Sequence, residues 1–221
     1  MNKTKIEWTD YTWNPIKGLC PVRCWFCYAR AMYKRFKRDE KLFYMIEDAW
    51  GESQFKKLKP SKIFICSTIE LFHPKIKPHW RDQVFREIEN NPQHTFQILT
   101  KLPENIDRPM PENVWLGVSV PYPTMEHERV FDLLQIKAKI RFISIEPLLE
   151  EYFHGLIPIA DLDWVIVGRL TGYGNKYNPD IESIERIIGD CRIAGVPLFL
   201  KDNLRPIMGD KIINQHQEFP L

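Results

Sequence analysis

The sequence has no long apolar run and little net charge. Its longest apolar runs are of strand length, so no segment is long enough to span a bilayer as a helix. The first ten residues, MNKTKIEWTD, lack the apolar region of a signal peptide. A net charge of +2 over 221 residues is too small to indicate nucleic acid by itself. We therefore expect a soluble, cytoplasmic protein that has no membrane partner.

The chain also lacks the paired cysteines of a disulfide-stapled protein. It has five cysteines, an odd number, and three of them (Cys20, Cys24 and Cys27) lie within eight residues. Such clustering in a cytoplasmic chain favours metal binding over disulfides. We expect Cys66 and Cys191 to be buried packing residues and assign neither to a metal.

No repeat, low-complexity stretch or clear linker divides the chain, so we predict a single domain over residues 1–221 with an insertion around residues 41–60. Residues 28–62 carry ten Lys and Arg against five Asp and Glu. This basic stretch could meet phosphate, or it could be an ordinary solvated helix face.

Short, nearly continuous apolar runs alternate with helical patterns. Such runs suit strands that are buried on both faces of a parallel sheet. The predicted strands are residues 62–67, 95–100, 114–120, 140–145, 164–168 and 196–201, after a short strand before Cys20. One predicted helix begins at Tyr28, and the others cover residues 45–58, 79–89, 124–134 and 181–194. This alternation predicts an α/β fold, a partial TIM-like (β/α) barrel of about six to seven parallel strands.

The three clustered cysteines have the spacing C-x3-C-x2-C. Thiolates hold iron–sulfur clusters, and three of them on a [4Fe–4S] cube leave one iron free to bind S-adenosylmethionine (SAM). A closed zinc site needs a fourth ligand, and the nearest histidine, His73, is 46 residues from Cys27. Three cysteines with this distant histidine remain an alternative.

With the aromatic Phe26 before the last cysteine, this motif resembles the signature of the radical SAM superfamily. The resemblance implies a [4Fe–4S] cluster on the loop after the first barrel strand, with Phe26 near the adenine of SAM. It also implies an electron donor such as flavodoxin or ferredoxin.

Further segments resemble a small radical SAM family of undefined function that is common in phages and prophages. These segments are IEWTDYTWNP, ELFH, TFQILTK, NVWLGVSV, RFISIEPLLE and AGVPLFLK. Members of that family carry Gly-Gly-Glu-Ser after the WVIVG strand, where this chain has Gly168, Arg169, Leu170 and Thr171. An acid and a hydroxyl that the resemblance implies are therefore missing or displaced there, and the substrate or the activity can differ.

Polar residues follow the predicted strands at the ends where barrel enzymes place functional groups. Ser67, Thr68 and Glu70 follow the second strand, where the resemblance implies binding of the SAM amino group. They could instead form a helix cap with an acidic first turn. Ser119 is a candidate for the SAM ribose or carboxylate.

Glu146, Arg169 and Lys201 end later strands and are the candidate catalytic or substrate-contacting residues. A carboxylate at a barrel mouth costs free energy unless it is paired or used. Two adjacent basic groups could bind an anionic substrate, or one of them could simply pair with Glu146.

These residues together predict a radical SAM enzyme that abstracts hydrogen from an unidentified substrate, with a nucleotide or nucleic acid as one option. The alternative is a non-catalytic nucleic-acid-binding protein with a structural zinc or iron–sulfur site. The basic segment 30–41, with Tyr33 and Phe36 interleaved, motivates this alternative.

Overall fold

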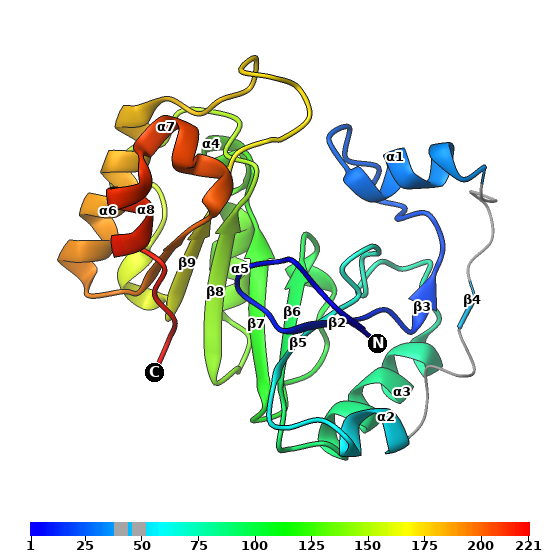
Figure 1. Ribbon diagram of the computed structural model, residues 1–221. Helices are drawn as coiled ribbons and strands as arrows, with labels where there is room; N and C mark the ends of the chain where they lie inside the picture. Colours follow the sequence, from blue (N-terminus) through cyan, green and yellow to red (C-terminus); the bar gives the residue numbers. More distant parts are fainter. Residues whose placement is uncertain (38–43, 46–51) are drawn as a thin grey trace. The chain divides into compact units, whose positions relative to one another are not determined.

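The computed structural model describes residues 1–37, 44–45 and 52–221 (Figure 1). Eight strands form one mixed, mostly parallel sheet in the order β1-β2-β5-β6-β7-β8-β9-β10. The predicted α/β class with a mostly parallel sheet is confirmed, whereas its closure into a partial barrel stays a prediction. The chain divides into two compact units, Met1–Trp115 and Leu116–Leu221.

The first unit is built around short parallel strands. β2 (Tyr11–Trp13) pairs in parallel with β5 (Lys62–Ile65), and β5 pairs in parallel with β6 (Thr95–Thr100). β1 (Asn2–Lys3) adds to β2 in the antiparallel direction. The strands predicted before Cys20 and at residues 62–67 and 95–100 are therefore confirmed, the second of them two residues shorter.

The core of the first unit is aromatic. Trp13 is fully buried, and its ring meets Phe55 edge-on at a centroid distance of 5.1 Å. Phe55 in turn contacts Phe96 at 5.7 Å. Trp13 ends β2 and Phe96 belongs to β6, so these rings fix the strands that precede the polar segments described below.

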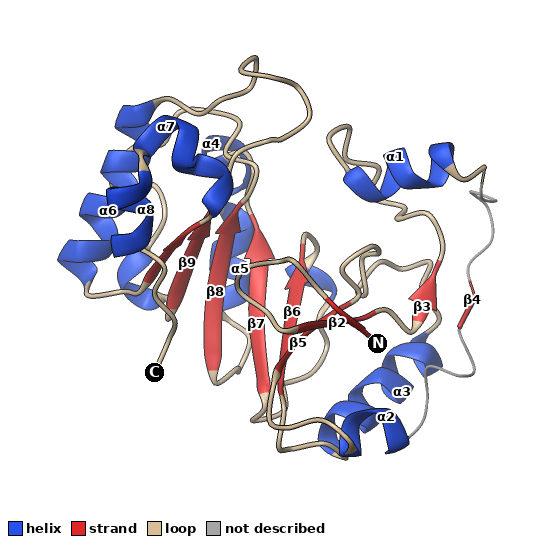
Figure 2. Ribbon diagram, viewed as in Figure 1, coloured by secondary structure: helices blue, strands red, loops and turns tan. Residues whose placement is uncertain are grey.

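Figure 2 draws the helices of the described part of the first unit in blue. They are α1 (Tyr28–Arg35), α2 (Glu52–Lys56) and α3 (Pro78–Glu89), and the 3-10 turn Pro103–Asn105 follows β6. α3 begins with proline, which suits a first helical position, and buries Trp80, Val84, Phe85 and Ile88. A small second sheet pairs β3 (Ile16–Lys17) with β4 (Tyr44–Met45) and was not expected from the sequence. Residues 41–43 and 46–51 of the predicted insertion lie outside the described residues. The helix predicted at 45–58 is wrong at Met45, which pairs in β4, and in the described part it is helical only over Glu52–Lys56.

The second unit continues the pattern of buried parallel strands. β7 (Val114–Ser119) crosses the boundary between the units, and β8 (Ile140–Ile145), β9 (Trp164–Val167) and β10 (Leu198–Leu200) follow. β8 pairs in parallel with β9, and β9 with β10. Every residue of β9 is buried, as the unbroken apolar run predicts.

Helix α6 (Ile181–Ala194) confirms the helix predicted over the same residues and is capped at both ends. The Asp180 carboxylate accepts a hydrogen bond from the Ser183 N–H at 2.8 Å, and Gly195 ends the helix at a φ of 68°. The helix predicted at residues 124–134 is instead divided at His127 into α4 (Pro123–Glu126) and α5 (Glu128–Leu134).

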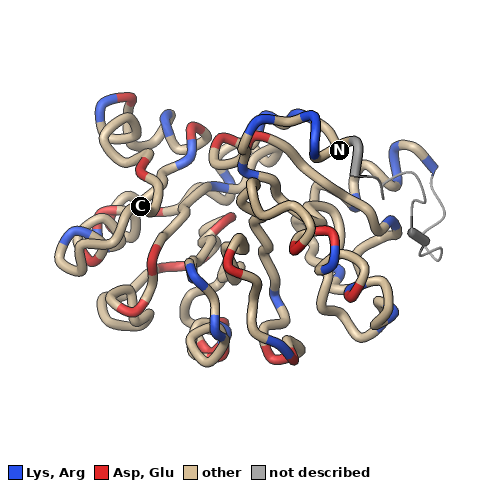
Figure 3. The backbone as a smooth tube through the Cα atoms, turned by 90° about the horizontal axis from the view of Figure 1, so that it is seen from below, with Lys and Arg blue, Asp and Glu red and all other residues tan. Residues whose placement is uncertain are grey.

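The C-terminal segment adds elements that the sequence did not predict. These are the 3-10 turn Asp202–Leu204 and the short helices α7 (Arg205–Met208) and α8 (Asp210–Gln215). Earlier in the chain, a 3-10 turn over Ile159–Asp161 precedes β9. Among the described residues, no helix combines the length and apolar character needed to cross a membrane. Basic and acidic residues are interspersed along the chain (Figure 3).

Candidate functional site

The three clustered cysteines lie on the loop between β3 and α1. Cys20, Cys24 and Cys27 are half-buried and are not joined in disulfides. Cys27 is the N-cap of α1 and makes no side-chain capping bond, and its N–H donates to the Cys24 carbonyl at 3.2 Å. The start of the helix therefore fixes one end of the loop, with the Cys27 thiol not used for capping.

The other end of this loop is held by a buried tyrosine. The Gly18 N–H donates to the hydroxyl of Tyr33 at 3.0 Å, and Tyr33 lies on the inner face of α1. Gly18 has a φ of 143°, a conformation that glycine adopts readily. The loop thus folds back onto the helix that follows it.

Cys20 lies in an environment that keeps its thiol protonated. Burial raises its pKa above the usual value, whereas the N–H groups of Val22 and Glu70 lower it. The Glu70 carboxylate and Cys27 raise it further by charge repulsion. Both groups therefore lie close enough to Cys20 to influence its charge, and Cys20 must lose a proton before it can bind a metal.

The residue types on this loop fit a cluster held by three thiolates better than a closed zinc site, which needs four ligands. In the described part of the chain, no three or more His, Cys, Asp or Glu side chains are grouped so as to hold a metal ion. Cluster binding by these cysteines therefore stays a prediction.

The segment after β5 comes close to the cysteine loop. Cys66 has a left-handed φ of 53°, and its N–H donates to the Trp13 carbonyl at the end of β2. The Ser67 hydroxyl exchanges hydrogen bonds with the Asn14 side chain at 3.1 and 3.2 Å. The Tyr28 hydroxyl donates to the Ser67 carbonyl at 2.9 Å. Ser67 is thereby tied to the first residue of α1, directly after Cys27.

Glu70 is buried and surrounded by donors from its own unit. Its Oε1 accepts from the Thr100 hydroxyl at 2.6 Å and from the Phe72 N–H at 3.2 Å. Its Oε2 accepts from the Lys101 N–H at 2.8 Å. The carboxylate thus joins the segment after β5 to the end of β6, and its predicted role in binding the SAM amino group stays a prediction.

The remaining predicted SAM contacts of the first unit are half-buried. Thr68 lies in the turn after β5, and Phe26 lies on the cysteine loop. The Phe26 ring meets the Trp25 ring edge-on at 5.5 Å. Cys20, Cys24, Cys27, Phe26, Ser67, Thr68 and Glu70 therefore all belong to one compact unit. The sequence missed Asn14, Tyr28 and Thr100 as their partners, although each lies at a strand end or helix start.

In the second unit, Glu146 and Lys201 form an ion pair. Lys201 Nζ lies 2.5 Å from Glu146 Oε1, and the two side chains are 14% and 25% exposed, respectively. Glu146 follows β8 and Lys201 follows β10, so the pair crosses the end of the intervening strand β9. The sequence left open whether one of the two basic residues pairs with Glu146, and the structure shows that Lys201 does.

Gly168, at the end of β9, makes room for this ion pair. A Cβ atom added there would lie 3.1 Å from Glu146 Cγ and Cδ and from Lys201 Cδ. These distances are shorter than ordinary carbon contacts, so a side chain at this position would displace one or both partners.

Arg169 is held by asparagine side chains. Its N–H donates to Asn203 Oδ1 at 3.1 Å, its Nε donates to the Asn203 carbonyl, and its Nη1 donates to Asn178 Oδ1 at 3.0 Å. Asn203 Nδ2 returns a bond to the Arg169 carbonyl at 3.0 Å. These bonds tie the loop after β9 to the 3-10 turn after β10, and contact with a substrate stays a prediction.

Ser119, the last residue of β7, is 1% exposed. Its carbonyl accepts from Arg129 Nη1 at 3.0 Å, and Arg129 also pairs with Glu126 at 2.7 Å. The side-chain role predicted for Ser119 in binding SAM stays a prediction.

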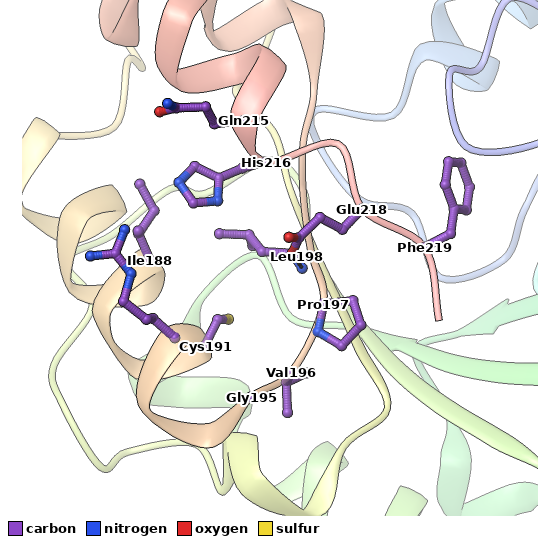
Figure 4. Close-up of a pocket in the computed structure, with 11 residues that line it drawn as sticks. Ile188, Cys191, Gly195, Val196, Pro197, Leu198, Gln215, His216, Glu218 and Phe219 are labelled. Atoms are coloured by element: carbon purple, nitrogen blue, oxygen red, sulfur yellow. Dashed lines mark hydrogen bonds between the residues drawn. The ribbon is translucent and has the colours of Figure 1, made fainter. Parts of the chain in front are cut away.

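A cavity of about 540 Å³ lies in the second unit at the other end of β10 from Lys201 (Figure 4). The C-terminal segment forms one wall, and burial lowers the pKa of His216 there. The end of α6 forms another wall, and the carbonyl end of a helix is partially negative and disfavours anions. The cavity residues are Ile188, Cys191, Arg192, Gly195, Val196, Pro197, Leu198, Gln215, His216, Glu218 and Phe219. We assign this cavity no part in the candidate site.

The fold and the cysteine loop together define an α/β protein with a mostly parallel sheet and a candidate metal-binding loop before α1. The chain belongs to DUF5131, a family described as "Protein of unknown function", which it matches over residues 3–207. No curated protein and no solved structure matches it. The family match includes the cysteine loop and all the predicted site residues, and excludes α8 and the C-terminal wall of the cavity.

Proposed function

We propose that this protein is a radical SAM enzyme. The observation that carries the proposal is the C-x3-C-x2-C loop, whose three half-buried cysteines lie directly before α1. The proximity of Ser67 and Glu70 to this loop supports it, because hydroxyl and carboxylate groups suit the polar end of SAM.

The cluster would be held by Cys20, Cys24 and Cys27. When bound and reduced, such a cluster supplies the electron that cleaves the sulfonium C–S bond of SAM, giving methionine and a 5′-deoxyadenosyl radical that takes hydrogen from the substrate. An electron donor such as flavodoxin or ferredoxin would provide that electron. Phe26, Ser67, Thr68 and Glu70, which all belong to the first unit, would bind SAM.

The substrate would contact Glu146, Lys201 and Arg169. The ion pair between Glu146 and Lys201 offers one group of each charge, at strand ends of the kind that carry function in parallel α/β folds. A substrate with both a donor and an anionic group could exchange partners with this pair.

The test is anaerobic reconstitution with iron and sulfide, followed by dithionite and SAM. We expect a brown protein that absorbs near ~400 nm and releases 5′-deoxyadenosine. Replacing any one of Cys20, Cys24 and Cys27 with Ala should abolish both properties, whereas Cys191→Ala should retain them, because Cys191 is buried in the second unit. A wild-type cluster that yields no 5′-deoxyadenosine with several reductants would contradict the proposal.

A second candidate is nucleic-acid binding, either alone with a structural metal or as the way a radical enzyme holds its substrate. Tyr28 and Phe36 on and after α1 are 57% and 58% exposed, and the Arg35 guanidinium lies 5.7 Å from the centroid of the Phe36 ring. Exposed aromatic rings among basic residues suit stacking on single-stranded bases.

Metal content and salt dependence separate these candidates. One zinc in a colourless protein, with binding of single-stranded DNA or RNA that weakens as salt rises, would favour the non-catalytic alternative. Unchanged affinity when Lys34, Arg35 and Lys37 are all replaced with Gln would remove the basis for nucleic acid at this helix.

A further inference from the structure

Arg30 is a basic residue on the same side of α1 as the last cysteine of the loop. It is the third residue of the helix and follows Cys27, the N-cap, by three positions. Residues three apart share a helix face, and helical side chains lean toward the N-terminus. This places the Arg30 side chain over the first turn of α1, where the cysteine loop ends.

One nitrogen of the Arg30 guanidinium has no partner in the described part of the chain. Nη2 is buried from solvent, and no described residue hydrogen-bonds to it. A buried charged donor that is left unpaired costs free energy, so such groups in native proteins call for an explanation. A ligand that is not part of the chain is one explanation.

The surroundings of Arg30 are basic. Residues 11–37 contain no Asp or Glu, so the cysteine loop and α1 provide no acid to pair with it. The carboxylate that lies near the loop, Glu70, already accepts hydrogen bonds from Thr100, Phe72 and Lys101. The missing partner of Arg30 is therefore an anion from outside the loop.

We propose that Arg30 binds the carboxylate of the methionyl group of SAM. The planar guanidinium fork matches the two oxygens of a carboxylate, and this pairing is stronger than a neutral hydrogen bond. The inference rests on the proposed function and deepens it, because it assigns a residue to one end of SAM. Arg30 is thus a ligand-binding residue rather than part of the surface charge of α1.

The experiment measures binding, not turnover, in the reconstituted full-length protein. The variants are Arg30→Gln and Arg30→Lys, with Lys57→Gln as the control because Lys57 is an exposed basic residue of the same unit outside α1. The probes are SAM and decarboxylated SAM, which lacks the carboxylate. Iron per chain is measured first for each protein.

We expect Arg30→Gln to keep its iron and to bind SAM roughly 10- to 100-fold more weakly, as loss of a charge-assisted hydrogen bond predicts. Its affinity for decarboxylated SAM should equal that of the wild type. Arg30→Lys should recover part of the affinity for SAM, and Lys57→Gln should bind both probes normally.

Three results would overturn the inference: unchanged SAM affinity in Arg30→Gln, equal weakening toward both probes, or loss of iron confined to the Arg30 variants. The last would assign Arg30 to the cluster or to folding instead. If the wild type holds no cluster or binds no SAM, the proposed function fails first, and the iron measurement and the wild-type titration identify that case.

Discussion

Glu70 is a buried carboxylate whose two oxygens have three donors around them, and an amide cannot replace it without conflict. In Glu70→Gln, one amide oxygen can still accept from Thr100 and Phe72. The NH₂ group then faces the Lys101 N–H, placing two donors 2.8 Å apart in the wild-type geometry. We expect a loss of about 1–3 kcal/mol in the free energy of unfolding, measured by urea denaturation.

The matched control for this prediction is Glu104→Gln, because Glu104 is an exposed acid shortly after β6, the strand that ends at Thr100. Its effect should stay within about 0.5 kcal/mol. Equal stability of the two variants would mean that the hydrogen bonds of Glu70 contribute nothing to the fold, leaving ligand binding as the reason for a buried acid there.

Cys20 gives a second prediction at the residue scale, on the pH dependence of metal loading. Burial and the Glu70 carboxylate raise the pKa of its thiol, so the metal-free chain holds Cys20 protonated at neutral pH. A metal must displace this proton, so binding strengthens as pH rises toward that pKa. Iron retained per chain under limiting iron should be greater at about pH 8.5 than at about pH 7. Equal retention at both values would contradict the assignment of Cys20 as a ligand.

At the scale of elements, Gly168 at the end of β9 leaves the space that the ion pair between Glu146 and Lys201 needs. Gly168→Ala should cost about 1–3 kcal/mol of stability, because its Cβ would lie 3.1 Å from atoms of Glu146 and Lys201. If the pair serves catalysis, SAM cleavage should continue while substrate turnover falls. Chemical denaturation and separate assays of 5′-deoxyadenosine and product measure these effects.

A second glycine provides the control for steric crowding. Gly189 lies inside α6, and the nearest atom to an added Cβ is His154 Cε1 at 4.0 Å. Gly189→Ala should therefore raise stability by about 0.5–1 kcal/mol, because alanine favours the helix. Equal effects of the two substitutions would show that crowding of the ion pair is absent.

The elements that the sequence predicted well have either an unbroken apolar run or clear residues at their ends. β9 is apolar at each position and buried at each position, and α6 carries both its Asp180 cap and its Gly195 stop. The β3–β4 pair and α8 were missed because two-residue strands and a six-residue helix have too few residues to show a period.

In the candidate site, the cysteines could be predicted from the sequence, but the hydrogen-bond and ion-pair partners could not. The three cysteines follow from spacing alone. The bond between Glu70 and Thr100 joins residues 30 positions apart, and that between Glu146 and Lys201 joins residues 55 apart. Only the pairing of neighbouring strands brings such groups together, so a single sequence identifies the strand ends but not their partners.

At the scale of the whole molecule, each unit contains a buried thiol. Burial raises the pKa of Cys66 in the first unit and of Cys191 in the second unit to about 12, from a usual value of 9.0. Both thiols therefore stay protonated in the folded chain at a pH where the unfolded chain has lost those protons. Raised pKa values of Cys20 and Tyr152 act in the same direction.

This difference predicts a protein that loses stability in mild alkali. A thiol whose pKa is raised by folding contributes its full stabilisation below pH 9 and loses it as the pH rises toward 12. Each such group lowers the free energy of unfolding by about 1.4 kcal/mol per pH unit within that range. Urea denaturation of the metal-free protein between about pH 8 and about pH 10.5 should show a steady decline. Cys191→Ala loses packing at every pH, but its decline with pH should be shallower by the contribution of one group, so identical slopes in the two proteins would show that Cys191 is not protected from ionisation by the fold.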